Sequence, residues 1–317
     1  MERIKVGVVG VGYLGQHHAR IYAEMGDVEL VGVADLDIVR AREIAKKHKT
    51  EAFGSYEELI GKVDAVSIVA PTVMHHGIAK AMLEASVDVL LEKPMTKTVE
   101  EADELVGLAD KGGRILQVGH LERFNSAVRK MVDMVTKPMF IECNRLSPFP
   151  DRSTDVDVVL DLMIHDIDII LSLVRSPVKS IHAAGIPVIS RSVDIANARM
   201  EFESGCIANI TSSRISIKKE RKIRLFQADT YLSLDYQNQE LYAYHRIPNK
   251  KDPDGKPDIV GGKVKVVKEE PLKAELQAFL QSVRTRVRPL VSGEEGREAL
   301  KVAMMVQQEI MSRSASL

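Results

Sequence analysis

Asp161 and His165 have the residue types and the spacing that general acid–base catalysis requires. They lie four residues apart in an apolar segment, residues 158–174, so in a helix their side chains share one face. Histidine has a reference pKa of about 6.5, and a carboxylate one turn away can orient its ring. Asp168 and Ser172 continue the stripe. The alternative to a catalytic pair is that this polar stripe is the solvent-exposed face of a surface helix.

Lys93 is a second candidate for chemistry. It lies between Glu92 and Pro94, directly after an apolar run at residues 87–91 that is typical of a buried strand. A lysine at the mouth of a parallel sheet is either a catalytic group or a solvated loop charge, and the position at the mouth favours the first. Glu92 could orient this lysine or bind a cofactor. Pro94 restricts Lys93 to an extended backbone.

The start of the chain predicts the element that would bring a cofactor to these groups. An apolar run, residues 4–9, leads into Gly10-Val11-Gly12-Tyr13-Leu14-Gly15, a helical pattern, a second apolar run at residues 28–34 and Asp35. This order is typical of the dinucleotide-binding unit. Gly10 permits the tight turn, Gly12 leaves room for the pyrophosphate, and Gly15 lets helix and strand pack closely. The alternative is a turn whose glycines serve packing alone.

Asp35 favours NAD over NADP, because a carboxylate repels a 2′-phosphate and can accept hydrogen bonds from the ribose. Arg40 and Arg42 lie close enough in the sequence to leave NADP open.

The rest of the first 121 residues predicts a doubly wound parallel sheet. Strand patterns at 65–70, 87–91 and 114–118 alternate with helical patterns at 37–48, 74–85 and 98–111. Ligands of such sheets bind beyond the carboxyl ends of the strands. Ala70-Pro71-Thr72 and Glu92-Lys93-Pro94 should therefore border the cofactor.

Residues 122–317 predict a second, α+β domain. Helical patterns near 123–135 and 158–175 precede a β-rich stretch from about 178 to 245. Residues 248–262 are rich in Asn, Lys, Asp, Gly and Pro, which predicts a mobile loop. Two helices should close the chain, one opening at Pro271 and one after Ser292.

Composition excludes several classes of protein. The chain has 317 residues and a net charge of −1, with no basic footprint for nucleic acid. Two cysteines, Cys143 and Cys206, indicate buried thiols rather than a disulfide framework or a CxxC metal site, and no metal is expected. The first predicted strand begins almost at Met1, so we expect no signal peptide and a cytoplasmic protein.

The stretch from Arg214 to Arg224 carries six basic residues, the two end residues included. Such a run usually forms a solvated strand edge or hairpin. It would also suit a clamp for a phosphorylated or nucleotide-linked substrate, because arginine binds phosphate in a bidentate fork.

Taken together, these motifs resemble the Gfo/Idh/MocA oxidoreductases over nearly the whole chain. The resemblance rests on the glycine turn, on Ala70-Pro71-Thr72 with His75, on Glu92-Lys93-Pro94, and on Asp161-Leu162-Met163-Ile164-His165 with Asp168. It implies a Rossmann domain, then a domain whose open, mostly antiparallel sheet commonly forms the interface of a homodimer or homotetramer. It also implies NAD(P)-dependent chemistry on a sugar-like hydroxyl. Many members have a glycine cluster before the Asp–His helix, where this chain has Thr154-Asp155-Val156-Asp157.

The motifs and the resemblance together define a set of expected site residues. Catalysis is expected of Lys93, Asp161 and His165. Cofactor contacts are expected of Gly10, Gly12, Tyr13, Leu14, Gly15, Asp35, Ala70, Pro71, Thr72, His75, Glu92 and Lys93, and substrate contacts of Lys93, Arg123, Asn125, Asp161, His165 and Arg214.

A finer resemblance links residues 194–199, 205–209 and 226–231 to one bacterial subgroup. That subgroup oxidises the 3-hydroxyl of UDP-N-acetylglucosamine ahead of a transaminase, toward amide-linked lipid A. Two alternatives stay open. One is a free-sugar or inositol dehydrogenase of the same family. The other is an NAD-responsive regulatory protein, against which the acid–base set argues.

Overall fold

The computed structural model describes residues 3–149, 156–251 and 255–314 of the chain. Two compact units are present. The first contains the chain up to Leu121 together with Glu270–Leu300, and the second contains Glu122–Glu269 and the chain from Lys301 onward. The sequence-based assignment kept residues 270–300 with the second domain.

The first unit is built on a parallel sheet of six strands in the order β3-β2-β1-β4-β5-β6. The strand order reverses between β1 and β4, which is where doubly wound sheets bind ligands. The predicted Rossmann sheet is therefore confirmed. Its strands are β1 (Ile4–Val9), β2 (Val28–Ala34), β3 (Glu51–Phe53), β4 (Ala65–Ile68), β5 (Asp88–Glu92) and β6 (Leu116–Gly119).

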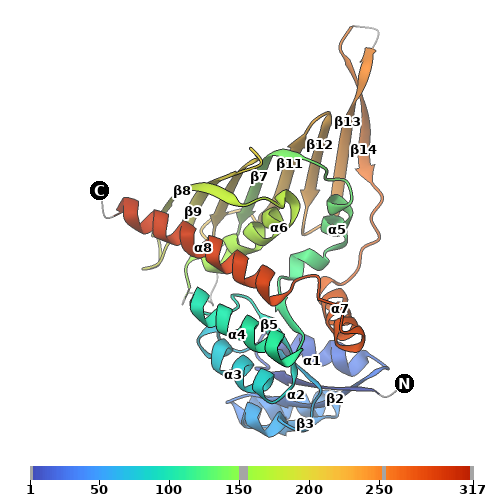
Figure 1. Cartoon of the computed structure of the whole chain (residues 1–317), viewed down its shortest axis with the longest axis vertical. Coiled ribbons are helices and arrows are strands. Elements are labelled where there is room, and N and C mark those ends of the chain that lie inside the picture. Colours follow the sequence, from blue (N-terminus) through green and yellow to red (C-terminus); the bar gives the residue numbers. More distant parts are fainter. Residues whose placement is uncertain (1–2, 150–155, 252–254, 315–317) are drawn as a thin grey trace. The chain divides into compact units, whose positions relative to one another are not determined.

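Helices cover this sheet, and one of them comes from the end of the chain. Helix α7 (Pro271–Thr285) lies beside α1 (Gly15–Glu24), as Figure 1 shows. Its buried side chains Leu276, Phe279 and Val283 join the same core as Ile21 and Tyr22 of α1. This shared core explains why residues 270–300 belong to the first unit. The other elements here are α2 (Ile38–His48), η1 (Tyr56–Leu59), α3 (Thr72–Glu84) and α4 (Val99–Gly112).

The second unit is built on an eight-stranded sheet in the order β14-β13-β12-β11-β7-β10-β9-β8. All its strand pairs are antiparallel except β10 with β7, which confirms the predicted open, mostly antiparallel sheet. The strands are β7 (Pro138–Leu146), β8 (Val178–Ile186), β9 (Ile195–Phe202), β10 (Ile207–Ser213), β11 (Glu220–Gln227), β12 (Thr230–Asp235), β13 (Glu240–Lys251) and β14 (Pro257–Val264).

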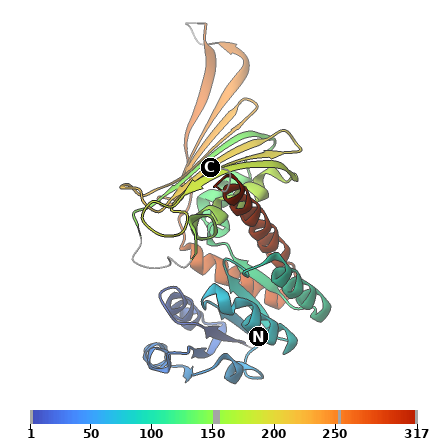
Figure 2. The ribbon, with the colours of Figure 1, turned by 90° about the vertical axis from the view of Figure 1, so that its left-hand side faces the viewer.

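Burial alternates along these strands, so one face of the sheet is covered. Ala196, Ala198 and Met200 of β9 are buried, whereas Asn197 between them is exposed. The covering helices α5 (Ser126–Val132) and α6 (Ile164–Val174) contact β12 and β7, respectively (Figures 1 and 2). The remaining elements are η2 (Leu121–Phe124), the π-helix η3 (Val159–Met163) and α8 (Gly293–Ser314), which passes from the first unit into the second at Lys301.

The predicted mobile loop at residues 248–262 is wrong. Most of this segment belongs to the hairpin of β13 and β14, which extends beyond the neighbouring strands in Figure 1. Cross-strand ion pairs such as Lys250–Asp258 and Lys263–Glu240 accompany the backbone pairing. Polar residues can thus line a two-stranded ribbon, because backbone hydrogen bonds do not require apolar side chains. Residues 252–254 lie outside the described part of the chain.

Both cysteines are buried and free, as predicted, and burial raises the pKa of each thiol. Within the described ranges, no helix has both the length and the apolar character needed to cross a bilayer.

Candidate active site

The glycine turn between β1 and α1 needs two of its glycines for its own geometry. Gly10 has a φ of +83°, and a Cβ there would lie 2.7 Å from the carbonyl oxygen of Val69. A Cβ on Gly15 would lie 1.8 Å from the carbonyl oxygen of Gly10. A Cβ on Gly12 would meet no atom within 4 Å. Gly12 is therefore dispensable for packing, and its missing side chain leaves room for a ligand.

Asp35 is held against this turn by backbone donors. One carboxylate oxygen accepts a hydrogen bond of 2.9 Å from Val11 N–H, and the other accepts one of 2.9 Å from Asp37 N–H. Arg40 lies 3.5 Å from Asp35 and 3.3 Å from Asp37, so its charge is shared between two carboxylates. Arg42 is exposed. The local charge around Asp35 thus favours a ribose hydroxyl over a 2′-phosphate.

A cavity of about 360 Å³ opens beside the turn, within the range of small-molecule sites. The predicted cofactor residues that line it come from the ends of β1, β2 and β4: Gly10, Gly12, Asp35, Ala70 and Pro71. These residues fit the adenosine and phosphates of a dinucleotide. Asp35 can accept hydrogen bonds from the ribose, and the missing side chain of Gly12 leaves space for the phosphates. Tyr13 is 72% exposed, whereas Leu14 packs against the core.

His75 connects two loops at the mouth of the sheet. It is buried in α3, which Thr72 begins, and its ring nitrogens lie 2.9 Å from the Pro94 carbonyl oxygen and 2.8 Å from that of Ala70. Burial lowers the pKa of His75, although both carbonyls oppose the shift. His75 therefore positions the segments after β4 and β5, and the cofactor contact predicted for it stays a prediction.

Glu92 and Lys93 lie at the end of β5. Glu92 is buried, and its carboxylate accepts a hydrogen bond of 3.2 Å from the Lys93 backbone N–H. Its other oxygen lies 3.5 Å from Nε2 of His18, a fully buried residue of α1. Sequence reasoning missed His18, because its place on the buried face of α1 is clear only once the helix is oriented. The Lys93 side chain is half-buried, and the Lys93–Pro94 peptide bond is cis.

Asp161 and His165 lie in the second unit, where the π-helix η3 runs into α6. Both side chains are half-buried. Asp157 caps this segment by accepting hydrogen bonds from the backbone N–H groups of Val159 and Leu160 and from Gln307. Single π turns within helices are frequent at functional sites. Thr154 and Asp155, which precede the cap, lie outside the described residues.

Two further carboxylates anchor α6 from its buried side. Asp166 forms hydrogen bonds of 2.8 and 2.9 Å with Arg145 of β7, and neither residue is more than 2% exposed. The Asp168 carboxylate lies 3.3 Å from Arg123, and both side chains are buried. Burial opposes the Arg145 charge, yet the ion pair with Asp166 raises the pKa of Arg145. The stripe of polar residues Asp161, His165, Asp168 and Ser172 is half-buried or buried. Its interpretation as the solvent-exposed face of a surface helix is therefore wrong.

Two of the residues predicted to contact substrate, Arg123 and Asn125, have structural partners, and their substrate contacts stay predictions. Asn125 is buried, caps α5 by accepting a hydrogen bond from Ala127 N–H, and donates to the Tyr236 carbonyl oxygen. Arg123 is occupied by Asp168. Both side chains hold α5 and α6 in place.

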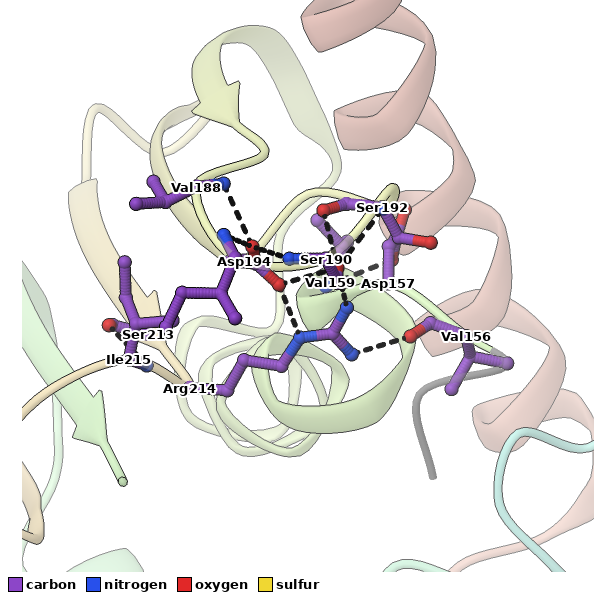
Figure 3. A network of polar contacts seen from close by, with 11 residues as sticks. Val156, Asp157, Val159, Val188, Ser190, Ser192, Asp194, Ser213, Arg214 and Ile215 are labelled. Carbon is purple, nitrogen blue, oxygen red and sulfur yellow. Dashed lines mark hydrogen bonds and ion pairs between the residues drawn. The ribbon is translucent and has the colours of Figure 1, made fainter. Parts of the chain in front are cut away.

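Arg214 departs most clearly from its prediction. It is 0% exposed, and its guanidinium donates to Asp194 at 2.9 Å, to the Val156 carbonyl oxygen at 2.8 Å and to Ser190 Oγ at 2.9 Å (Figure 3). A residue so enclosed has no surface to offer a substrate. Sequence composition alone could not separate this buried arginine from the exposed basic residues that follow it.

Known proteins place this arrangement in a family. The model of the oxidoreductase family with an NAD-binding Rossmann fold, GFO_IDH_MocA, matches residues 4–120, and the model of its C-terminal domain matches residues 128–229. UDP-N-acetylglucosamine 3-dehydrogenase of Acidithiobacillus ferrooxidans is 36% identical over 312 residues, which is 97% of each chain. The solved structure of that enzyme, GnnA, has a TM-score of 0.92 and covers 98% of this chain and 99% of its own.

More distant relatives share the fold with other sugar-like substrates. Myo-inositol 2-dehydrogenase of Thermotoga maritima is 25% identical and covers 94% of this chain and 93% of its own. Scyllo-inositol dehydrogenase of Lactobacillus casei, solved with NAD(H) and scyllo-inositol, has a TM-score of 0.81 at 18% identity and 98% coverage of each chain. With both domains matched and a relative similar over almost its whole length, this chain belongs to the Gfo/Idh/MocA oxidoreductases, enzymes with an NAD-binding Rossmann domain.

Proposed function

We propose that this oxidoreductase is an NAD-dependent dehydrogenase that oxidises a secondary hydroxyl of a nucleotide-linked sugar, the 3-hydroxyl of UDP-N-acetylglucosamine. The observation that carries the proposal is the Asp161–His165 pair on a helix anchored by buried ion pairs, in a chain 36% identical to a UDP-N-acetylglucosamine 3-dehydrogenase. The product of this reaction would be a 3-keto sugar. A transaminase would consume such a ketone on the route to an amide-linked lipid A precursor.

In this proposal one alcohol group of the sugar loses a proton and a hydride. Bound NAD, held by the glycine turn and Asp35, supplies the hydride acceptor. His165 removes the hydroxyl proton, and Asp161 orients the imidazole. Lys93 donates a hydrogen bond to the reacting oxygen and stabilises its developing negative charge. If the Lys93 side chain loses its proton on substrate binding, it serves as the base instead.

We also propose that the enzyme is cytoplasmic and that it forms a homodimer or homotetramer through the second sheet. The uncovered face of that sheet carries an aromatic row that runs across four strands, with neighbouring ring centroids 5.0–6.2 Å apart. Aromatic side chains are enriched in interfaces between proteins. The row consists of Phe140, Phe226, Tyr231 and Tyr244.

The test of function is the rise in NADH absorbance when the protein is mixed with NAD and UDP-N-acetylglucosamine, with a carbonyl trap to pull the equilibrium. We expect a trap-dependent signal that is lost in Lys93→Ala and retained in Lys97→Ala. Lys97 is an exposed lysine of the same segment, so it controls for the loss of a positive charge. No signal with NAD binding intact would refute the proposed substrate.

Two other functions have distinct outcomes in the same assay. A free-sugar or inositol dehydrogenase would reduce NAD with a neutral polyol, and UDP would not compete. An NAD-responsive regulatory protein would bind NAD and reduce none of it with any sugar.

A further inference from the structure

Arg221 is an arginine on the covered face of the second sheet. It lies in β11 directly opposite Arg145 of β7, and the side chains two and four residues further, Ile223 and Leu225, are fully buried. Its carbonyl oxygen accepts a hydrogen bond of 3.0 Å from Tyr236 N–H, which fixes the backbone. Because side chains alternate along a strand, the Arg221 side chain points to the face that α6 covers. It is half-buried there.

The carboxylates around Arg221 already have partners. Asp166 binds Arg145 through both oxygens, and Glu122 accepts from Arg145 at 3.4 Å and from Asn125 at 3.2 Å. In residues 3–149, 156–251 and 255–314, the Arg221 guanidinium has neither a hydrogen bond nor an ion pair. Its donors are thus available to a ligand.

The charges that act on Arg221 include one member of the acid–base pair. Burial lowers the pKa of Arg221, and the like charge of Arg145 lowers it further, against the opposing influence of Glu122, Asp166 and Asp161. Asp161 is the carboxylate one helical turn from His165. Arg221 and Asp161 therefore lie within electrostatic range in the same unit.

A half-buried guanidinium without an acceptor is unfavourable. Burial removes water that would hydrogen-bond to the charge, and no protein group replaces that water. A ligand that brings negatively charged oxygens would remove this penalty. Phosphate oxygens suit the planar fork of arginine, which can donate two parallel hydrogen bonds to them. The next basic residues along β11, Lys222 and Arg224, are exposed, and Arg224 pairs with Glu142.

We propose that Arg221 is a substrate-binding residue that donates hydrogen bonds to the diphosphate of the nucleotide sugar. This inference rests on the proposed function and corrects its residue assignment, since the role predicted for Arg214 passes to Arg221. The diphosphate distinguishes a nucleotide sugar from a free sugar or an inositol, so Arg221 determines specificity. Its loss should raise KM far more than it lowers kcat.

The experiment compares Arg221→Gln with Lys222→Gln. Both remove one positive charge from neighbouring positions of β11, but Lys222 is exposed and lies on the opposite side of the strand. Calorimetric titration with UDP and with UDP-N-acetylglucosamine, in the presence of saturating NAD, gives the dissociation constants. We expect Arg221→Gln to weaken both by about 10–100-fold, as for the loss of a hydrogen bond to a charged group. Lys222→Gln should stay within about threefold of the wild type, since exposed charges contribute little.

Thermal unfolding separates binding from support of the fold. In the absence of ligand, Arg221→Gln should melt at the wild-type temperature or higher, because no internal partner is lost. At one fixed UDP concentration, the melting temperature should rise as much in Lys222→Gln as in the wild type, and clearly less in Arg221→Gln. A lower melting temperature with unchanged UDP affinity would assign Arg221 a purely structural role and overturn the inference.

Failure of the inference and failure of the proposed function differ in outcome. If UDP-N-acetylglucosamine is turned over and Arg221→Gln binds UDP as tightly as the wild type, the function stands and the inference is overturned. If the wild type binds neither UDP nor UDP-N-acetylglucosamine, the proposed substrate is wrong, and inorganic pyrophosphate becomes the probe. Pyrophosphate binding that depends on Arg221 would keep the anion site for another phosphorylated sugar, and its absence would refute the site.

Discussion

The glycine turn of the first unit and the Asp161 helix of the second are built by different means. At the turn, Gly10 and Gly15 let backbone segments approach where a Cβ would collide, and Gly12 leaves space open. Around the helix, buried ion pairs set the geometry instead. These pairs are Arg145–Asp166, Arg123–Asp168 and Arg214–Asp194.

The difference concerns how each region can fail. Where backbone segments lie close together, an added Cβ collides with them and destabilises the fold. This loss of stability does not depend on charge. A buried ion pair fails when one partner is lost, because the remaining charge has neither water nor a counter-ion. The cofactor side should therefore be sensitive to side-chain size, and the substrate side to charge. The following predictions test this contrast.

His165→Ala should have the largest effect, on activity and not on folding. Loss of a general base lowers turnover by about 10²–10⁴. The variant should melt near the wild-type temperature, because His165 is half-buried and the ion pairs Arg145–Asp166 and Arg123–Asp168 stay intact. NADH production measures turnover, and His182→Ala, an exposed histidine of β8, is the control. Near-wild-type turnover in both His165→Ala and Lys93→Ala would refute the mechanism.

Arg145→Met should have the largest effect on folding. Asp166 would remain buried without its counter-ion, at a cost of about 3–5 kcal/mol in the free energy of unfolding. The double variant Arg145→Met/Asp166→Leu should recover most of this loss, because no unpaired charge remains in that pair. Denaturant titration measures both.

Arg224→Met is the matched control for that experiment. It breaks the ion pair with Glu142, in which the Arg224 side chain is 47% exposed. It should cost less than about 1 kcal/mol. Equal losses in Arg145→Met and Arg224→Met would remove the contrast between buried and exposed charges on this sheet.

Gly15→Ala and Gly12→Ala should separate folding from cofactor binding within one turn. A Cβ at Gly15 meets a backbone oxygen, so the chain must shift at a cost of about 1–3 kcal/mol or more. A Cβ at Gly12 meets nothing in the protein, so stability should stay within about 0.5 kcal/mol while NAD affinity falls at least about tenfold. Denaturant titration and NADH fluorescence report the two quantities. A fall in stability without loss of NAD affinity in Gly12→Ala would contradict the assignment.

The same contrast explains what the sequence could predict. The glycine turn and Asp35 lie within one short strand–helix–strand unit, and their spacing reports their roles. The partner of Asp166 is 21 residues away, that of Asp168 is 45 and that of Arg214 is 20, so no local pattern links them. A buried and an exposed arginine are identical as letters, which is why the basic stretch pointed to Arg214.

Two errors at the level of elements have a related cause. The hairpin of β13 and β14 is polar, and composition suggested a loop because it does not report backbone pairing. Helix α7 was predicted as a helix but kept with the second domain, since its apolar stripe does not indicate which core it joins. Both features depend on tertiary contacts over long separations in the sequence.

The smallest expected effect is the pH dependence that Asp194 contributes. Burial opposes its charge, but the Ser190 hydroxyl and the backbone N–H groups of Ser190, Val188 and Ile189 lower the pKa of Asp194. A depressed carboxylate pKa contributes stability above the unfolded value of about 3.9, and this contribution is lost as the pH falls through the folded value.

Asp194→Asn should therefore be less stable than the wild type by a constant amount between pH 7 and about pH 5. The difference should narrow only below about pH 4, where the Asp194 carboxylate takes up a proton in the unfolded wild type but not yet in the folded one. Denaturant titrations of both proteins across this pH range measure the difference in their free energies of unfolding. Groups other than Asp194 contribute equally to both proteins, so their contributions cancel in this difference. A difference that widens as the pH falls from 7 to 5 would mean that folded Asp194 takes up its proton in this range, so that its pKa is raised rather than lowered. The buried pair with Arg214 would then be a weaker anchor than its hydrogen bonds indicate.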